Sequence, residues 1–321
     1  LLLLTAIFNF KQKKMIKVSI NLILCILILS GCINPTPESS IHFVDTRVGS
    51  ASSVTKQAGR FGKGSEEYGQ TIPAVLEPNG MNFWTPQTRD TELKCIAPYY
   101  YEDSVIQGFR NSHWINGGCT QDYGSMTLMP LFGTLKTDTK TRGSVFSHDQ
   151  EIATPTYYSV YLEDYGIKAE MTGRSRSAIF KFTYDSEGDA YLVVNPNSDE
   201  GEGFIEIDTI KQEIRGYNPV HRIYQGWGEY AGFNGYFVVS YKNPLLGFGT
   251  FIGDSIIPGS ITQSNKEKIG AYIHFSTKKD EEILIKASSS FTDLEGALRN
   301  LDEEIPLWNF NYTREELTRI W

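Results

Sequence analysis

Six side chains between positions 84 and 122 have the chemistry that a sugar-binding surface needs. They are Trp84, Arg89, Asp90, His113, Trp114 and Asp122. Aromatic rings present flat apolar faces that match the C–H faces of a sugar, while charged and imidazole groups offer directional partners for its hydroxyls. A few polar groups among aromatic ones is the usual composition of a small-ligand pocket. This combination predicts a carbohydrate-binding surface.

Each of these residues also has a structural explanation. The two tryptophans suit a hydrophobic core, His113 suits a buried histidine satisfied by the backbone, and Asp122 suits the cap of a turn. Arg89 and Asp90 suit an ion pair with each other. The sequence holds no H-E-x-x-H, phosphate-loop or G-x-S-x-G motif, and spacing alone names no acid–base pair of carboxyls. From the residue types, a pocket and an ordered structural loop both stay open.

The region that holds these residues, 68–130, has weak periodicity and reads as long ordered loops. Within it, the stretch IQGFRNSHWINGGCTQDYGS at 106–125 combines a His-Trp pair, a Gly-Gly turn, a cysteine and an Asp-Tyr-Gly. Long loops in compact domains usually serve a function. We expect this stretch to be a ligand-facing loop and not a core element.

The elements that must position these residues are predicted to be short antiparallel strands. Phe180, Phe182 and Tyr184 share one face of the first clear strand, because side chains alternate between faces. The absence of helix-period segments between the strands indicates an antiparallel β-sandwich over 42–288. Alternating segments separated by turn signals such as DSEGD and TKKDEE lie at 178–184, 191–195, 203–208, 235–241, 270–276 and 282–288.

The last part of the sequence, 289–321, changes to a helical period. Thr292 followed by Glu295 fits a capping box, and an apolar stripe runs from there to Pro306. A second helix start is expected at Thr313. Its apolar stripe is barely two turns long, and so short a helix is marginal without packing. We interpret this segment as a truncated helical linker whose continuation is missing.

The first part of the sequence, 1–32, reads as a targeting segment. Residues 1–14 precede the first methionine and are interpreted as upstream translation. Residues 15–32 combine a basic start, an apolar run too short to span a membrane comfortably, and LSGC, which predicts a lipoprotein signal peptide with lipidation at Cys32. Residues 33–41 read as a flexible tether. We expect a protein of the bacterial cell envelope, lipid-anchored to the outer membrane on its periplasmic or surface side.

Charge and cysteine content restrict the possible partners. Positions 1–32 hold four of the 30 basic residues and none of the 38 acidic ones, so the rest has 26 basic residues and a net charge of −12. A nucleic-acid partner needs a basic face and is therefore not expected. Beyond position 32 the cysteines are Cys95 and Cys119. Export permits a disulfide between them, but the sequence does not decide their pairing.

Five segments resemble the N-terminal domain of glycoside hydrolase family 92, a family of exo-acting α-mannosidases. They cover nearly all of the chain beyond the targeting segment, in the family's order. Two positions depart from the family pattern: Ile115, where many members have a second histidine, and Asn79, where an aromatic residue is usual. The segments are VDTRVGS (44–50), GQTIPAVLEPNGMNFWTPQTRD (69–90), YYYEDSVIQGFRNSHWINGGCTQDYGSMTLMP (99–130), GWGEYAGFNGYFVVSY (226–241) and IKASSSFTDLEGALRNLDEEIPLWNF (285–310).

The resemblance implies a β-sandwich of the galactose-mutarotase-like supersandwich type, followed by a helical linker and an (α/α)6 barrel, with the active site between them. It implies calcium-dependent hydrolysis of terminal α-mannosyl residues with inversion. The general acid, the general base and most calcium ligands would come from the barrel. Trp84, Arg89, His113, Trp114 and Asp122 would belong to sandwich loops that complete the mannose pocket.

We therefore expect the N-terminal, substrate-binding domain of an inverting α-mannosidase, without its (α/α)6 catalytic barrel and inactive alone. The expected partners are a mannose-containing glycan, the missing barrel and, through the lipid, a membrane. Calcium would be held mainly by the barrel. A self-sufficient carbohydrate-binding lipoprotein and a sandwich that only packs against a partner are the alternatives.

Overall fold

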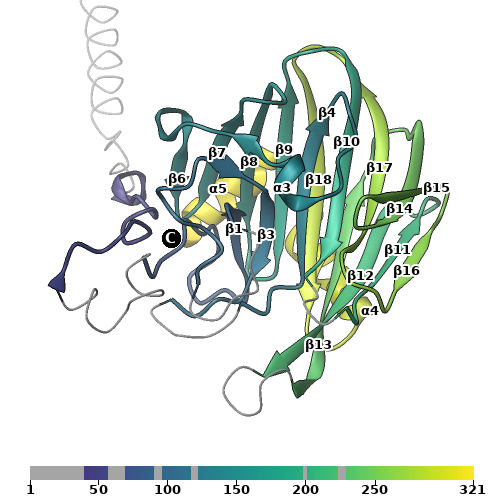
Figure 1. Ribbon diagram of the computed structural model, residues 1–321. Coiled ribbons are helices and arrows are strands. Elements are labelled where there is room, and N and C mark those ends of the chain that lie inside the picture. The colour runs from purple at the N-terminus through teal and green to yellow at the C-terminus, as the bar shows by residue number, and fades with distance from the viewer. Residues whose placement is uncertain (1–39, 57–68, 90–95, 117–121, 198–200, 223–228) are drawn as a thin grey trace, which may run out of the picture. The chain divides into compact units, whose positions relative to one another are not determined.

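Two antiparallel sheets stack face to face in the computed structural model, which describes residues 40–56, 69–89, 96–116, 122–197, 201–222 and 229–321 (Figure 1). In spatial order, the seven-stranded sheet has β1 (Phe83–Gln87), β3 (Gly108–Ser112), β4 (Met126–Phe132), β10 (Gly188–Pro196), β17 (Ile269–Thr277), β14 (Gly247–Ile252) and β15 (Ser255–Pro258). The predicted mostly-β antiparallel sandwich is confirmed.

The nine-stranded sheet forms the second layer of the sandwich. In spatial order it has β16 (Thr262–Ser264), β11 (Phe204–Asp208), β12 (Glu213–Arg222), β13 (Glu229–Tyr241), β18 (Glu281–Ser290), β9 (Ser177–Tyr184), β8 (Ile167–Gly173), β7 (Tyr157–Leu162) and β6 (Ile152–Thr154). A small separate ladder pairs β2 (Val105–Ile106) with β5 (Ser144–Val145). All six alternating segments picked out in the sequence coincide with strands of these sheets, with Gly203 just ahead of β11.

Alternation along the strands separates the core from the outer layer. On β9, Phe180, Phe182 and Tyr184 point into the main core between the sheets, as the sequence predicts. Ile179 points the other way, to the outer face, where it packs with residues of the C-terminal helical segment such as Phe310. A strand buried on both faces is expected where a helix covers the sheet.

Two helices, α4 (Leu294–Glu304) and α5 (Phe310–Ile320), cover the outer face of the nine-stranded sheet. Ala297 and Leu301 of α4 pack against Val238 of β13. The predicted caps are each displaced. Asp293, and not Thr292, caps α4, because its carboxylate accepts a hydrogen bond from the Gly296 N–H.

The second helix also begins earlier than the sequence pattern suggests. Asn309 caps α5 by accepting from the Tyr312 N–H at 3.0 Å, so Thr313 lies inside the helix. Asparagine is among the best N-cap residues, because its side-chain oxygen replaces a missing backbone acceptor. Shorter helical pieces are η1 (Ser40–Phe43), α3 (Thr139–Arg142) and η3 (His148–Gln150). No helix within the described ranges is long and apolar enough to cross a membrane.

Candidate functional site

The first part of the predicted loop, 106–125, is a core strand. All five residues of β3 are buried, and β3 pairs with both β1 and β4 in the seven-stranded sheet. The prediction that the whole stretch lies outside the core is therefore wrong for Gly108–Ser112. The chain leaves the sheet at His113 and comes back to it at β4, and residues 117–121 between these points lie outside the described residues.

Asp122 is the centre of a buried polar cluster where the chain returns. Its carboxylate accepts a hydrogen bond from Arg110 Nε at 2.6 Å, from the His113 N–H at 2.8 Å and from the Gly124 N–H at 3.0 Å. The side chains of Arg110 and Asp122 are 1% and 2% exposed. A carboxylate with this many donors and no access to solvent holds the two ends of the loop together. The turn-capping explanation fits Asp122.

His113 lies beside this cluster with its ring between aromatic neighbours. The ring stacks on Tyr123 at 5.2 Å between centroids and packs at 4.6 Å against Phe291. Burial lowers the pKa of His113 from 6.5 to about 4, so its imidazole is neutral at pH 7. Its Nε2 has no hydrogen-bond partner among the described residues. A neutral imidazole with a spare nitrogen can donate to or accept from a hydroxyl.

Both predicted tryptophans are completely buried. Trp84 packs edge-to-face on Phe180 at 5.8 Å in the main core. Trp114 belongs to a smaller apolar cluster with Tyr99 and Ile72. Neither ring has a face open to a ligand in this structure. The substrate contacts proposed for these two residues stay a prediction.

Arg89 pairs with Asp103, while its predicted pair with Asp90 lies outside the described residues. Its Nε lies 2.9 Å from Asp103 Oδ2, and its guanidinium carbon lies 4.1 Å above the centre of the Tyr100 ring. Asp90 lies outside the described residues, as do Cys32, Cys95 and Cys119. The five predicted site residues that the structure describes do not gather at one place. Asp122 and His113 are in contact, while Arg89 contacts the 99–104 segment through Asp103 and Tyr100.

Ile115 and Asn79, the two residues that depart from the family pattern, both lie in the described part of the chain. Ile115, in the place of a second histidine, is 53% exposed just before the undescribed part of the loop. Asn79 has φ = 62°, a left-handed conformation that asparagine adopts more readily than most residues. Its position is a tight turn, closed by a hydrogen bond from the Gly80 N–H to the Glu77 carbonyl at 2.8 Å.

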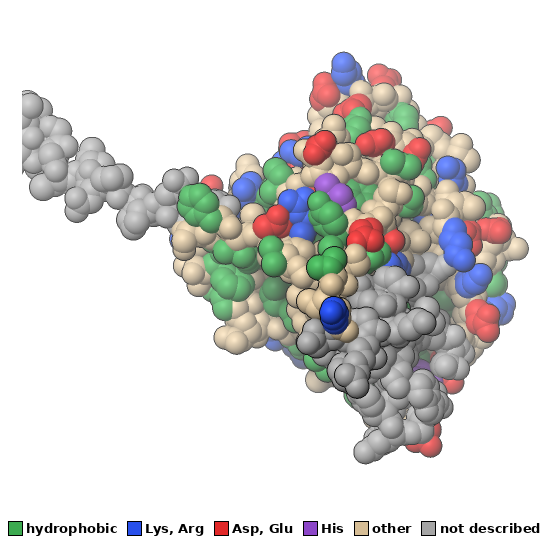
Figure 2. Space-filling view, turned by 60° about the vertical axis from the view of Figure 1, so that its left-hand side comes forward, with side chains coloured by type: hydrophobic (Ala, Val, Ile, Leu, Met, Phe, Trp, Pro, Cys, Tyr) green, Lys and Arg blue, Asp and Glu red, His purple; other side chains and the backbone are tan. Residues whose placement is uncertain are grey.

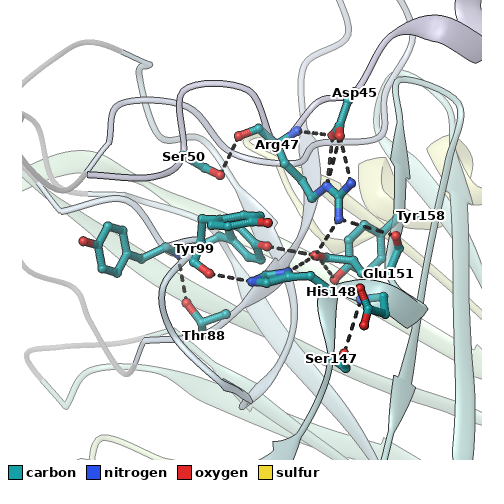
Figure 3. Close-up of polar contacts among 12 residues, drawn as sticks. Asp45, Arg47, Ser50, Thr88, Tyr99, Ser147, His148, Glu151 and Tyr158 are labelled. Carbon is teal, nitrogen blue, oxygen red and sulfur yellow. Dashed lines mark hydrogen bonds and ion pairs between the residues drawn. The ribbon is translucent and has the colours of Figure 1, made fainter. Parts of the chain in front are cut away.

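A second polar cluster surrounds Glu151, whose side chain is completely buried (Figure 3). Tyr99 and Tyr158 donate their hydroxyls to Glu151 Oε1 at 3.0 and 2.7 Å. His148 Nδ1 lies 2.6 Å and Arg47 Nη1 lies 3.4 Å from Glu151 Oε2. Burial raises the pKa of both tyrosines, and Glu151 raises it further, so both hydroxyls keep their protons. The cluster connects three segments that are far apart in the sequence: the one around Arg47, the one around Tyr99, and the one from His148 to Tyr158.

Sequence reasoning missed this cluster. Arg47 and Glu151 are separated by 104 positions, and no local pattern connects them. The only local signal is the spacing of His148 and Glu151, three residues apart, which places both on one side of a helical turn. Next to the cluster is an open hollow of about 530 Å³, lined by Tyr101, Glu102, Asp103, Ser104, Phe146, Ser147, His148 and Asp149.

Charged side chains are mixed on the face that includes the N-terminal part of the described chain. Figure 2 shows acidic, basic and apolar side chains interspersed there, without a broad basic area. The calcium that the sequence resemblance implies raises the question of a metal site. In the part of the chain that the structure describes, no three His, Cys, Asp or Glu side chains come close enough to hold one.

Comparisons with known proteins agree with this architecture. The N-terminal domain profile of glycosyl hydrolase family 92 matches residues 43–290. A family 92 inverting mannosidase from Bacteroides thetaiotaomicron VPI-5482 superposes with a TM-score of 0.74 at 30% identity, over 90% of this chain and 36% of that one. An α-mannosidase of the family from Bacteroides thetaiotaomicron gives 0.73 at 26% identity, over 88% and 37%. That second enzyme has also been solved with mannoimidazole. No curated protein matches.

The comparison covers only part of each similar mannosidase. This chain spans slightly more than a third of each of these two mannosidases. The profile match covers most of the chain and ends where β18 ends, at Ser290. The strand order, the family profile and the superpositions agree, and the chain belongs to glycosyl hydrolase family 92, within that family's N-terminal domain.

Proposed function

We propose that this chain is the substrate-binding domain of an inverting α-mannosidase that removes terminal α-mannosyl residues from glycans. The observation that carries the proposal is the 30% identity over 90% of the chain to an inverting mannosidase. The mannoimidazole complex of a second similar enzyme supports a mannose-like ligand. The rest of each mannosidase, which this chain does not cover, is where we place the (α/α)6 barrel and the acid and base.

The buried carboxylates of this chain support the proposal that it binds substrate while the acid and the base lie elsewhere in the complete enzyme. Inversion needs one carboxyl that donates a proton and another that activates water, about 6.5–9.5 Å apart. Asp122 is committed to Arg110 and two backbone N–H groups, and Glu151 is committed to two tyrosines, His148 and Arg47. Both carboxylates are buried and already bonded to donors of this chain. These residues position the loops, and His113 Nε2 is the group that we propose contacts a mannose hydroxyl.

In the described part of the chain, no three His, Cys, Asp or Glu side chains lie close enough together to hold calcium. Calcium prefers six to eight oxygen ligands. We propose that its ligands lie elsewhere in the complete enzyme.

The proposal predicts that the chain alone does not hydrolyse α-mannosides. Fused ahead of the remaining part of the similar inverting mannosidase, it should support turnover. In that fusion, His113→Ala should lower kcat/KM by roughly tenfold to a hundredfold, since a lost hydrogen bond costs about 1–3 kcal/mol. The melting temperature should change little by comparison. Kinetics and thermal unfolding on the same preparations provide both quantities.

His274→Ala is the matched control, because His274 is a partly exposed histidine that pairs with exposed Asp189. It should leave kcat/KM unchanged. A lowered melting temperature with normal kcat/KM in the His113 variant would make the histidine structural. Tight glycan binding by the chain alone, together with an inactive fusion, would favour the carbohydrate-binding lipoprotein instead.

We also propose that Cys32 is lipidated and holds the protein at the outer membrane of a bacterial envelope. The LSGC sequence after an apolar run supports this. Cys32→Ser should move the protein from the membrane to the soluble fraction, because several acyl chains anchor stably whereas an unlipidated tether does not. Fractionation of cells that express each form, followed by immunoblotting, measures the change. Equal membrane association of both forms would contradict the proposal.

A further inference from the structure

His148 has an acceptor at each of its two ring nitrogens (Figure 3). Nε2 lies 2.6 Å from the carbonyl oxygen of Tyr101, and Nδ1 lies 2.6 Å from Glu151 Oε2. A backbone carbonyl only accepts, so Nε2 must carry a hydrogen. The remaining question is which atom holds the proton between Nδ1 and Oε2.

The surroundings of Glu151 answer this question. Its carboxylate already accepts from Tyr99, Tyr158 and the guanidinium of Arg47. Burial of Glu151 alone would favour the neutral carboxyl, but an adjacent positive charge and several donors act against it and favour the ionised carboxylate. The proton therefore belongs to Nδ1, and both nitrogens of His148 donate. Without that proton, two lone pairs would face each other at 2.6 Å.

We infer that His148 is an imidazolium in the folded protein and that His148–Glu151 is a proton-dependent clasp. The clasp joins the turn at η3 to the 99–104 segment through the Tyr101 carbonyl, and the ring of Tyr101 stacks on His148 at 3.9 Å and 3°. Through Glu151, the clasp also reaches Arg47 in the segment that precedes β1. Deprotonation releases one hydrogen bond and one ion pair at the meeting point of these segments.

The charged and titratable groups near His148 in the described part of the chain act within this balance. Glu151 and, at the hollow beside the ring, Asp149, Glu102 and Asp103 favour the charged ring. Arg47 and Arg89 oppose it, but Arg47 is itself paired with Asp45 at 2.8 Å and Arg89 with Asp103 at 2.9 Å. Tyr99 and Tyr158 donate to Glu151, and burial raises the pKa of both. The Tyr101 ring stacks on His148, and Phe146 contributes an apolar edge at 5.1 Å. Acidic groups predominate in these surroundings.

The direction of the pH dependence follows from linkage. An unfolded histidine titrates near pH 6.5. A group that the fold holds protonated contributes stability that is complete below that pH and is lost as the pH rises through the titration of the folded pair. His113 acts in the opposite sense below pH 6.5, because burial lowers its pKa to about 4. A comparison between variants that share His113 removes that contribution.

The first test measures thermal unfolding of the full chain and of His148→Phe at pH 6 and pH 9. Phenylalanine retains the ring stacking on Tyr101 and removes both hydrogen bonds. At pH 6 the wild type should have a higher melting temperature than the variant. This difference in melting temperature should be smaller by about 5 °C at pH 9. His274→Phe, which removes a solvent-exposed pair, should show a change below about 2 °C. If the wild type exceeds His148→Phe in melting temperature by the same amount at both pH values, the proton-dependent clasp is wrong.

The second test needs no variant to fold. Long-range ¹H–¹⁵N spectra of the wild-type chain distinguish a doubly protonated imidazole from both neutral tautomers. The His148 ring, assigned through its contact with the Tyr101 ring, should carry hydrogen on both nitrogens at pH 7 while His113 carries one. A neutral tautomer of His148 at pH 7 would contradict the inference.

Discussion

Replacing Asp122 with alanine is expected to lower the free energy of unfolding by about 3–5 kcal/mol, because it breaks a buried ion pair from one side. The substitution takes the carboxylate from Arg110, whose side chain is 1% exposed, and takes the acceptor from the N–H groups of His113 and Gly124. Urea unfolding followed by tryptophan fluorescence measures the change. Trp114, directly after His113, makes the signal sensitive to this region.

Glu315→Ala provides the control, because Glu315 and Arg319 form an exposed ion pair with side chains 66% and 67% accessible. Its cost should be about 0–1 kcal/mol. Asp122→Asn should lie between the two, since it keeps one acceptor oxygen but loses the charge. Equal stabilities for the Asp122 and Glu315 variants would show that the buried pair does not hold the loop.

Gly124→Ala is expected to be similarly damaging for a steric reason. A Cβ at position 124 would overlap the carbonyl oxygen of Asn111, far inside van der Waals contact, and would crowd the Cα of Ser112 at 3.1 Å. Backbone cannot turn aside as a side chain can, so β3 or the Asp122 turn must shift. Overpacking of this kind costs about 1–3 kcal/mol and sometimes more, and we expect the upper end. Urea unfolding and amide exchange on β3 measure it.

Gly247→Ala is the matched control on another strand of the same sheet. A Cβ there would meet only the His274 side chain, at 3.6 Å, which is an ordinary contact. Alanine should therefore be tolerated at Gly247, within about 0.5 kcal/mol, as for substitutions away from special features. The steric account is wrong if Gly124→Ala is as stable as Gly247→Ala.

Strands with a clear polar and apolar face could be predicted from the sequence, and strands without one could not. β9 was found because Phe180, Phe182 and Tyr184 alternate with other residues. β3 was missed because GFRNS has no apolar alternation, although every residue in it is buried. Its polar side chains are tolerated inside only because partners elsewhere in the chain satisfy them, as Asp122 does for Arg110.

The same reason limits prediction of the candidate site. Residue types at 113 and 122 suggested a polar site, and the structure does bring His113 and Asp122 together. Arg110 was not singled out, because its role depends on a turn that closes twelve positions later. The Glu151 cluster draws on residues more than a hundred positions apart. The order of the strands in the sheets decides which distant residues meet. The periodicity of residues within a segment does not predict that order.

The positions of β17 and β18 have a consequence for how the domain folds. β17 joins β10 to β14 within one sheet, and β18 joins β13 to β9 at the middle of the other. Both strands come late in the sequence, between Ile269 and Ser290. Among the described strands, four partial sheets therefore keep open edges until β17 and β18 pair with them. Pairing over such sequence distances is slow, and until it is complete the open edges are exposed to wrong partners.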